Sequence, residues 1–230
     1  MLELLDKVKE NRDSALAEIA EAASRAGRQP EDVSIMAVTK THPVEYISAA
    51  VNCGILHIGE NRISEGGRKI RQLGSDYAIF HAIGVLHRKE VRQAVRDFHC
   101  LDAVHKIEII EEIARRKASP QILFEVNTSG EAAKKGFPPD VVLLENILGR
   151  AIELELPVKG LLTVGPLGDD SVLQRKAFAD LRVIRDSLES RLKVSLPELS
   201  MGMSDDFTLA VLEGSTMVRL GRRLFGSRGV

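Results

Sequence analysis

The stretch "VSIMAVTKTHPVEYISAAVNCGILHIGENR", residues 33–62, contains the unit from which the fold can be read. It begins with a short apolar run at 33–40, continues with a helical pattern that opens at Pro43, and returns to an apolar run at 55–60. Proline suits the first turn of a helix, because the N–H that it lacks would have no partner there. Short apolar runs rich in β-branched residues are typical of strands buried on both faces of a parallel sheet. The stretch therefore predicts a strand, a helix and a second strand.

The same unit recurs along the whole chain. There are eight apolar runs, at residues 33–40, 55–60, 78–84, 100–104, 121–127, 158–164, 198–204 and 217–221. Helical patterns lie between them, and one more, at roughly 2–26, precedes the first run. Eight strands that alternate with helices favour an α/β fold of the closed (β/α)8 type, a TIM barrel, here with an extra N-terminal helix. An open doubly wound sheet is the alternative, but no G-x-G-x-x-G pattern follows the first run.

Length and composition limit the class of protein. The chain has 230 residues, a formal net charge of -1 and 44% hydrophobic residues, so we expect one barrel domain over residues 1–230 and no nucleic-acid partner. The N-terminal segment is charged throughout, and no apolar run approaches the ~18 residues of a membrane span, so we expect neither a signal peptide nor a membrane partner. Cys53 and Cys100 lack metal-ligand spacing and are expected to be reduced thiols. These features indicate a cytoplasmic protein, and we expect a monomer.

In a barrel of this kind the functional site lies at the C-terminal ends of the strands. The first such residue is Lys40, at the end of an apolar run. A lysine in an apolar setting can have a lowered pKa and act as a nucleophile that forms a Schiff base. The alternative is a lysine that extends into solvent or pairs with a carboxylate such as Glu60. The other polar, small or charged residues at these ends are Glu60, Asn61, His81 to Gly84, Asn127, Thr163, Ser204, Arg219 and Gly221.

Two further stretches suggest a binding site for an anion. In "SMGMSDDF", residues 200–207, Ser204 precedes a helical pattern that would hold Asp205 and Asp206 in its first turn. This is either an ordinary helix cap or a phosphate site at free N–H groups. In "GSTMVRLGRRLFG", residues 214–226, the last strand ends at Gly221 before a short helix. Phosphate sites between the loops after strands seven and eight recur in TIM barrels.

A nucleophilic lysine and a phosphate site together limit the ligand. Pyridoxal 5′-phosphate carries both an aldehyde and a phosphate, and would satisfy both features. A phosphorylated sugar bound by a lysine aldolase is the competing interpretation.

Seven motifs, taken in order, resemble one family. They are "AVTKTHP" (37–43), "HIGENR" (57–62), "HAIG" (81–84), "VNTSGEAAKKG" (126–136), "KGLLTVGP" (159–166), "LSMGMSDDF" (199–207) and "GSTMVRLGRRLFG" (214–226). The chain resembles the pyridoxal phosphate homeostasis proteins, also called the YggS or PROSC family, over essentially its whole length. That family is similar to the N-terminal barrel domain of alanine racemase.

The resemblance implies pyridoxal 5′-phosphate as cofactor, held covalently by Lys40. It implies further cofactor contacts from Asn61, His81, Met201, Ser204, Arg219, Gly221 and the backbone of Arg222. Ser204, Gly221 and Arg222 would bind the phosphate, and Arg219 would lie beside the pyridine nitrogen. Lys134 matches a second lysine implicated in cofactor handling.

Some positions depart from the family pattern. Within "IGVLHRKE", residues 83–90, His87, Lys89 and Glu90 replace the usual Gln, Asn and Lys. Arg222 stands where a hydroxyl side chain commonly meets the phosphate. The first departure affects a possible partner surface for apo enzymes that receive the cofactor, and the second affects the phosphate site.

The sequence favours a carrier over an enzyme. An arginine, which stays protonated, should leave the adjacent pyridine nitrogen unprotonated, so the ring becomes a poor electron sink. Racemases with this arginine use a lysine and a tyrosine as bases on opposite faces, and in alanine racemase the tyrosine comes from a second domain. This chain has only Tyr46 and Tyr77. We therefore expect a carrier and regulator of pyridoxal phosphate without significant catalysis, with a racemase or related enzyme as the alternative.

Overall fold

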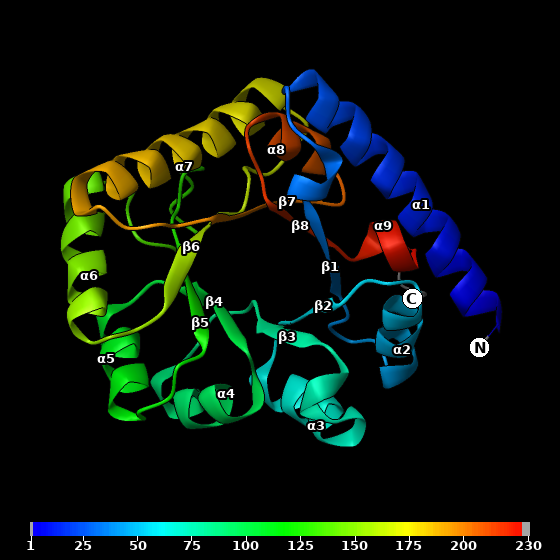
Figure 1. Ribbon diagram of the computed structural model, residues 1–230, viewed down its shortest axis with the longest axis horizontal. Coiled ribbons are helices and arrows are strands. Elements are labelled where there is room, and N and C mark those ends of the chain that lie inside the picture. Colours follow the sequence, from blue (N-terminus) through cyan, green and yellow to red (C-terminus); the bar gives the residue numbers. More distant parts are fainter. Residues whose placement is uncertain (1, 227–230) are drawn as a thin grey trace.

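The eight predicted strands form a closed parallel barrel. The computed structural model describes residues 2–226, and its strands follow one another around the barrel from β1 (Ser34–Val38) to β8 (Met217–Leu220), which pairs with β1. Figure 1 shows the barrel surrounded by helices, with the long helix α1 (Leu2–Arg25) along one side. The prediction of a TIM barrel with an extra N-terminal helix is confirmed.

The elements alternate as the sequence suggested. The intermediate strands are β2 (His57–Glu60), β3 (Ile79–Ala82), β4 (Cys100–Val104), β5 (Gln121–Glu125), β6 (Val158–Leu162) and β7 (Glu198–Met203). The helices after α1 are α2 (Val44–Asn52), α3 (Ile63–Leu73), α4 (Val91–Asp97), α5 (Ile107–Arg115), α6 (Val141–Glu153), α7 (Ser171–Leu192), α8 (Phe207–Leu212) and α9 (Arg222–Phe225). One difference bears on the site: α8 begins at Phe207, so Asp205 and Asp206 lie before the helix and not in its first turn.

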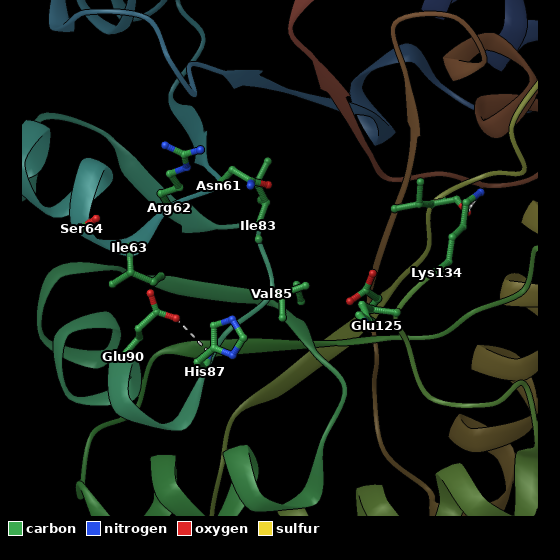
Figure 2. A pocket seen from close by; sticks show the side chains of 14 residues that line it. Asn61, Arg62, Ile63, Ser64, Ile83, Val85, His87, Glu90, Glu125 and Lys134 are labelled. Atoms are coloured by element: carbon green, nitrogen blue, oxygen red, sulfur yellow. Dashed lines mark hydrogen bonds between the residues drawn. The ribbon is translucent and has the colours of Figure 1, made fainter. Parts of the chain in front are cut away.

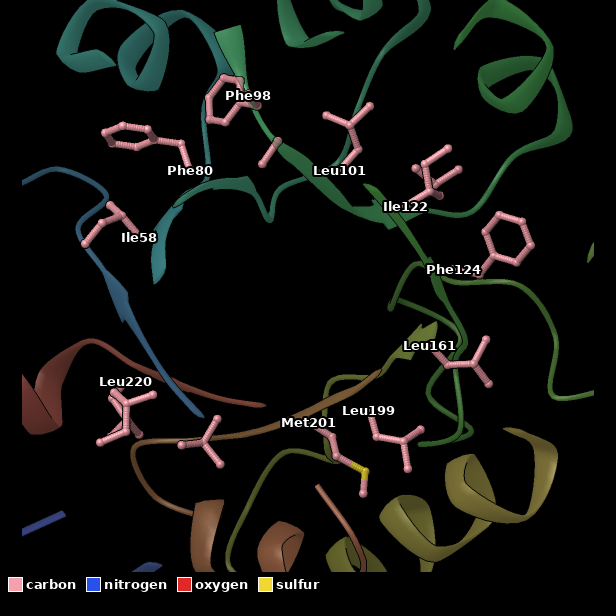
Figure 3. Close-up of a cluster of buried hydrophobic side chains, with 14 of the residues drawn as sticks. Ile58, Phe80, Phe98, Leu101, Ile122, Phe124, Leu161, Leu199, Met201 and Leu220 are labelled. Atoms are coloured by element: carbon pink, nitrogen blue, oxygen red, sulfur yellow. The ribbon is translucent and has the colours of Figure 1, made fainter. Parts of the chain in front are cut away.

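The core has two layers, one on each side of the strands. Figure 3 shows the outer layer, in which side chains point away from the barrel axis toward the helices: Ile58, Phe80, Leu101, Ile122, Phe124, Leu161, Leu199, Met201 and Leu220. Each is at most 1% exposed. Burying one such side chain stabilises the fold by roughly 1.5–3 kcal/mol. Because both faces of every strand are buried, the strands read as continuous apolar runs.

The first and last helices lie side by side. The buried face of α1 consists of Val8, Ala15, Ile19, Ala22 and Ala23, and it packs against α2, α8 and α9. The Asn11 side-chain amide donates a hydrogen bond to the Leu224 carbonyl oxygen at 2.8 Å. The N-terminal helix therefore supports the short helix that follows the last strand.

A separate test concerns membranes. Within residues 2–226, no helix combines the length and the apolar character that crossing a bilayer would require.

Candidate functional site

A cavity of about 550 Å³ opens at the C-terminal ends of β1, β7 and β8. Its lining brings together residues far apart in the chain: Val38, Lys40, His42, Ile83, Met203, Ser204, Asp205, Arg219, Gly221, Arg222 and Gly226. Five residues expected in the site are among them. This volume lies within the range of small-molecule sites in proteins.

Lys40 lies in a tight turn directly after β1. The His42 N–H donates to the Thr39 carbonyl oxygen at 3.1 Å, so that Lys40 and Thr41 are the two central residues of the turn. Thr41 has φ of 66°, a left-handed conformation that β-branched residues rarely adopt and that costs roughly 1–3 kcal/mol. The turn brings the Lys40 side chain to the wall of the cavity.

Glu60, the carboxylate named above as an alternative partner of Lys40, has other contacts. Its Oε1 accepts a hydrogen bond from Lys69 Nζ at 2.7 Å and another from the Thr39 hydroxyl. Glu60 is fully buried, and its Cβ packs beneath Gly66 of α3. It is not among the residues that line the cavity.

Arg219 forms part of the inner wall of the cavity, and its guanidinium is fixed by β6 and β7. Arg219 Nη1 donates two hydrogen bonds, one to the Ser200 carbonyl oxygen at 2.7 Å and one to the Ser200 hydroxyl at 2.9 Å. Nη2 donates to the carbonyl oxygen of Thr163 at 2.8 Å. Within the described part of the chain, these contacts engage three of its five N–H groups, and the others remain for a ligand. Burial lowers the pKa of Arg219, while the carboxylates of Asp102 and Asp206 oppose that change.

The loops that follow β7 and β8 line a part of the cavity that is suited to an anion. The Ser204 hydroxyl oxygen accepts a hydrogen bond from the backbone N–H of Arg223 at 3.2 Å, so its own O–H can donate into the cavity. At Gly221, a Cβ would have no protein atom nearer than 3.5 Å, so packing does not demand glycine there. The Arg222 side chain lines the cavity and pairs with Asp205, which offsets part of its charge.

Three residues expected to contact the ligand lie elsewhere. Met201 is fully buried in the outer layer of the core, and the wall of the cavity is formed by Met203 instead. Asn61 lines a neighbouring cavity. His81 is 2% exposed and lies inside the barrel, outside the set of residues that line either cavity.

The barrel interior holds a chain of hydrogen bonds through His81. Its Nδ1 lies 2.8 Å from Asp102 Oδ2, and its Nε2 lies 2.9 Å from His57 Nδ1. Burial would lower the pKa of His81, but the Asp102 carboxylate outweighs it and raises the pKa to about 10. Burial and the neighbouring His81 lower the pKa of His57 to about 4. His81 is therefore an imidazolium that donates to both partners.

Cys100 lies beside this pair, and the ligand-type atoms of Cys100, His81 and Asp102 are all within 4.8 Å of one another. A metal ion held by these three residues would have to displace the proton that joins His81 to Asp102. Because both ring nitrogens of His81 already have partners, the arrangement is that of a buried ion pair.

A second cavity, of about 530 Å³, adjoins the first and shares Ile83 with it. Figure 2 shows Asn61 and Ile83 on one side of this cavity and Glu125 and Lys134 on the other. Lys134 Nζ donates to the Gly165 carbonyl oxygen and lies 3.3 Å from Glu131 Oε1. Lys134 therefore lies in the cavity next to that of Lys40.

Sequence reasoning missed two groups of residues at this end of the barrel. The apolar lining from Val38 and Met203 was not named, and Ile83 was included only within the strand-end range 81–84. Lys69 and Glu65, which contact the turn of Lys40, were also missed, although their spacing of four residues on one helix face was visible in the sequence.

Comparison with known proteins places the chain in a family. No family model matches it. A curated relative from Aquifex aeolicus, named pyridoxal phosphate homeostasis protein, is 35% identical over 224 residues, which cover 95% of this chain and 97% of the relative. The chain belongs to the pyridoxal phosphate homeostasis protein family. A relative of the same name from Schizosaccharomyces pombe is 33% identical and covers 86% of this chain and 85% of its own length. The resemblance seen in the motifs is thus confirmed.

Solved structures with a similar fold support the same assignment. PipY of Synechococcus elongatus, solved with PLP bound, superposes with a TM-score of 0.78 at 33% identity, covering 90% of this chain and all of PipY. Alanine racemase from Bacillus anthracis gives a TM-score of 0.74 at 18% identity, and the match covers 98% of this chain but 57% of the racemase. At that identity the racemase shows the shared fold alone.

Proposed function

We propose that this protein binds pyridoxal 5′-phosphate through Lys40 and acts as a carrier and regulator of the cofactor in the cytoplasm, without significant catalysis. The observation that carries the proposal is the single cavity that joins a lysine amine, a fixed arginine and an anion site. Membership of the pyridoxal phosphate homeostasis family and the PLP-bound structure of PipY support it. Apo enzymes that need the cofactor are the proposed recipients, and the proposed carrier is a monomer.

The residues of the cavity fit the cofactor in shape and charge. The absent side chain of Gly221 leaves room that a larger residue would fill, next to the Ser204 hydroxyl and the backbone N–H of Arg222. These groups would bind the phosphate, and Arg222 would add a positive charge partly offset by Asp205. Met203, Val38 and Ile83 supply apolar walls for the ring.

Lys40 and Arg219 would define how the cofactor is held. Lys40 would hold the cofactor through its amine, and the aldehyde of pyridoxal phosphate would supply the electrophilic carbon for that attachment, with loss of one water molecule. Arg219 would face the ring nitrogen with one of its remaining N–H groups. A protonated arginine at that position leaves the nitrogen without a proton, which weakens the ring as an electron sink.

The positions of the tyrosines favour a carrier over a racemase. Tyr46 stacks against His42 at a centroid distance of 4.3 Å and packs edge-on against Phe225, which fixes its ring in the outer wall. Tyr77 lies before β3, at the opposite end of the barrel. Neither tyrosine is among the residues that line the cavity, so the catalytic base expected on the second face of the cofactor has no counterpart there.

The decisive experiment locates the modified lysine. The full chain is incubated with pyridoxal phosphate, reduced with borohydride and digested, and peptide masses are measured. We expect the adduct on Lys40, its loss in Lys40→Ala with an unchanged circular dichroism spectrum, and its retention in the control Lys134→Ala. An adduct confined to another lysine would refute the proposal, and rapid racemisation of L-alanine by the loaded protein would favour the alternative.

A further inference from the structure

A buried ionic cluster lies behind the turn that carries Lys40. It consists of Lys69 and Glu65 from α3 and Glu60 from the end of β2, and we call it the Lys69 cluster. Lys69 is 8% exposed, and its Nζ lies 2.7 Å from Glu60 Oε1 and 2.8 Å from Glu65 Oε1. Burial would raise the pKa of Glu65, but hydrogen bonds from Lys69 and from the Thr41 N–H hold it below its usual value. Glu65 is therefore a carboxylate near neutral pH.

The Lys69 cluster contacts both neighbours of Lys40. Lys69 Nζ donates to the Thr39 carbonyl oxygen at 2.9 Å, and the Thr39 hydroxyl donates to Glu60. On the other side, the Thr41 backbone N–H donates to Glu65 Oε1 at 2.7 Å. All three N–H groups of the Lys69 ammonium thus have acceptors, and one of these acceptors is the carbonyl oxygen that closes the turn.

The turn needs such support, because its own residues do not favour its shape. The left-handed position in a turn of this kind normally holds glycine or asparagine, whereas here it holds Thr41. A threonine stays in this conformation only where surrounding contacts hold it there. The hydrogen bond from Thr41 to Glu65 is charge-assisted, and such bonds are stronger than neutral ones.

We propose that Lys69 is a positioning residue for Lys40. Together with Glu65 and Glu60, it holds the strained turn so that the Lys40 amine points into the cavity. This inference rests on the proposed function, because it concerns how Lys40 meets the aldehyde. A fixed amine loses less freedom when it condenses with the aldehyde, so both the affinity and the rate of adduct formation should depend on the cluster. The residues proposed to bind the phosphate directly follow β7 and β8, whereas the Lys69 cluster belongs to β2 and α3.

The test uses two ligands that share the ring and the phosphate. Pyridoxal 5′-phosphate can condense with Lys40, whereas pyridoxine 5′-phosphate carries an alcohol in place of the aldehyde and cannot. In the double variant Lys69→Met/Glu60→Gln both buried charges are removed together. We expect the affinity for pyridoxal phosphate and the rate of adduct formation to fall about tenfold, since small misplacements of reacting groups have effects of this size or larger. The affinity for pyridoxine phosphate should stay within about twofold of wild type.

A milder pair of variants keeps the proposal testable if the double variant fails to fold. In Glu65→Gln, the amide oxygen can still accept the Thr41 N–H, whereas in Glu65→Ala no acceptor remains. We expect Glu65→Ala to lose about tenfold in affinity for pyridoxal phosphate and Glu65→Gln to lose about threefold or less. Lys176→Met, which removes an exposed helix lysine paired with Asp180, is the matched control and should match wild type.

The outcomes separate the two proposals. If wild type forms no adduct on Lys40, the proposed function fails. If wild type forms it and the cluster variants bind pyridoxal phosphate equally well and equally fast, the positioning role is refuted. An equal loss of affinity for both ligands would also refute it, because that pattern indicates general damage to the cavity.

Discussion

The buried pair of His81 and Asp102 should give this protein an unusual dependence of stability on pH. Both residues are at most 2% exposed, and their side chains meet at 2.8 Å inside the barrel. The pKa of His81 is about 10 in the folded protein, against about 6.5 in an unfolded chain. The perturbation is Asp102→Asn, which keeps the size of the side chain but removes the negative charge.

The sign of the pH dependence of stability follows from the direction in which the pKa is shifted. Because the folded pKa of His81 is raised, its contribution to stability is fully present below about pH 6.5 and is lost as the pH rises toward 10. Between these values the free energy of unfolding should fall by about 1.4 kcal/mol per pH unit, or roughly 3 kcal/mol over two units. His57, whose folded pKa is lowered to about 4, contributes stability above pH 6.5 that is lost as the pH falls toward 4. The combined contribution of the two histidines to stability should therefore be greatest near pH 6.5.

Asp102→Asn should remove the alkaline part of this profile. Without the carboxylate, His81 is neutral in the folded state near pH 7, so the slope above pH 6.5 should largely disappear. Leaving a buried partner unpaired costs about 3–5 kcal/mol, and we expect a loss of this order at pH 6.5.

The assay is urea unfolding at several values between about pH 6.5 and 8.5, followed by circular dichroism. Asp97→Asn is the control, because Asp97 pairs with Arg71 and Arg96 outside the barrel. Burial would raise the pKa of Asp97, but hydrogen bonds and the charges of the arginines hold it below its usual value. That control should keep the wild-type slope. A wild-type profile that is flat over this range, or an Asp102→Asn profile with the same slope as wild type, would contradict the assignment of His81 as an imidazolium.

Two further predictions concern the cavity wall. Gly221→Val should fill the space proposed for the phosphate and lower the affinity for pyridoxal phosphate at least tenfold. The melting temperature should change little, because a Cβ at this position meets no protein atom nearer than 3.5 Å. Titration with pyridoxal phosphate, followed by absorbance, measures the change in affinity. Met201→Ala should lower the free energy of unfolding by about 2–5 kcal/mol and leave cofactor affinity intact. Met203→Ala, at a residue that is 39% exposed, should lower cofactor affinity and leave the free energy of unfolding nearly unchanged. Equal effects of the two variants on binding would argue against the placement of these side chains.

Much of the fold could be read from the sequence because its signals are local and repeated. Each strand of the barrel is a short run such as 121–127, buried on both faces, and each run is followed by a helical pattern. The ends of the runs were placed less well, because the last residues of a run, such as Thr163, leave the sheet while remaining buried. A run of residues suited to burial does not show where the strand ends and the buried loop that follows it begins.

The site was predictable where a residue's role depends on its place at a strand end. Lys40, Ser204, Arg219 and Gly221 meet in one cavity as expected. Met201 did not, because a strand that is apolar on both faces gives no alternation from which the direction of a side chain can be read.

The local backbone accounts for the exchange of Met201 and Met203. Gly202 has φ of 93°, and the pairing of β7 with β8 shifts register between Ser200 and Met203. A side chain at position 202 would also collide with Ala210, whose Cβ would be 2.6 Å away. The chain therefore turns at Gly202 and directs Met203 into the cavity.

The closure of the barrel by β1 and β8 has a consequence for synthesis of the protein. During translation Lys40 leaves the ribosome early, whereas Gly221, which follows the strand that closes the barrel, emerges about 180 residues later. A nascent chain thus exposes the Lys40 amine long before the loop proposed to bind the phosphate has been synthesised. Under the proposed function, the cofactor could be held at both ends only after β8 has paired with β1, so a product truncated before β8 would carry the lysine without the proposed phosphate site.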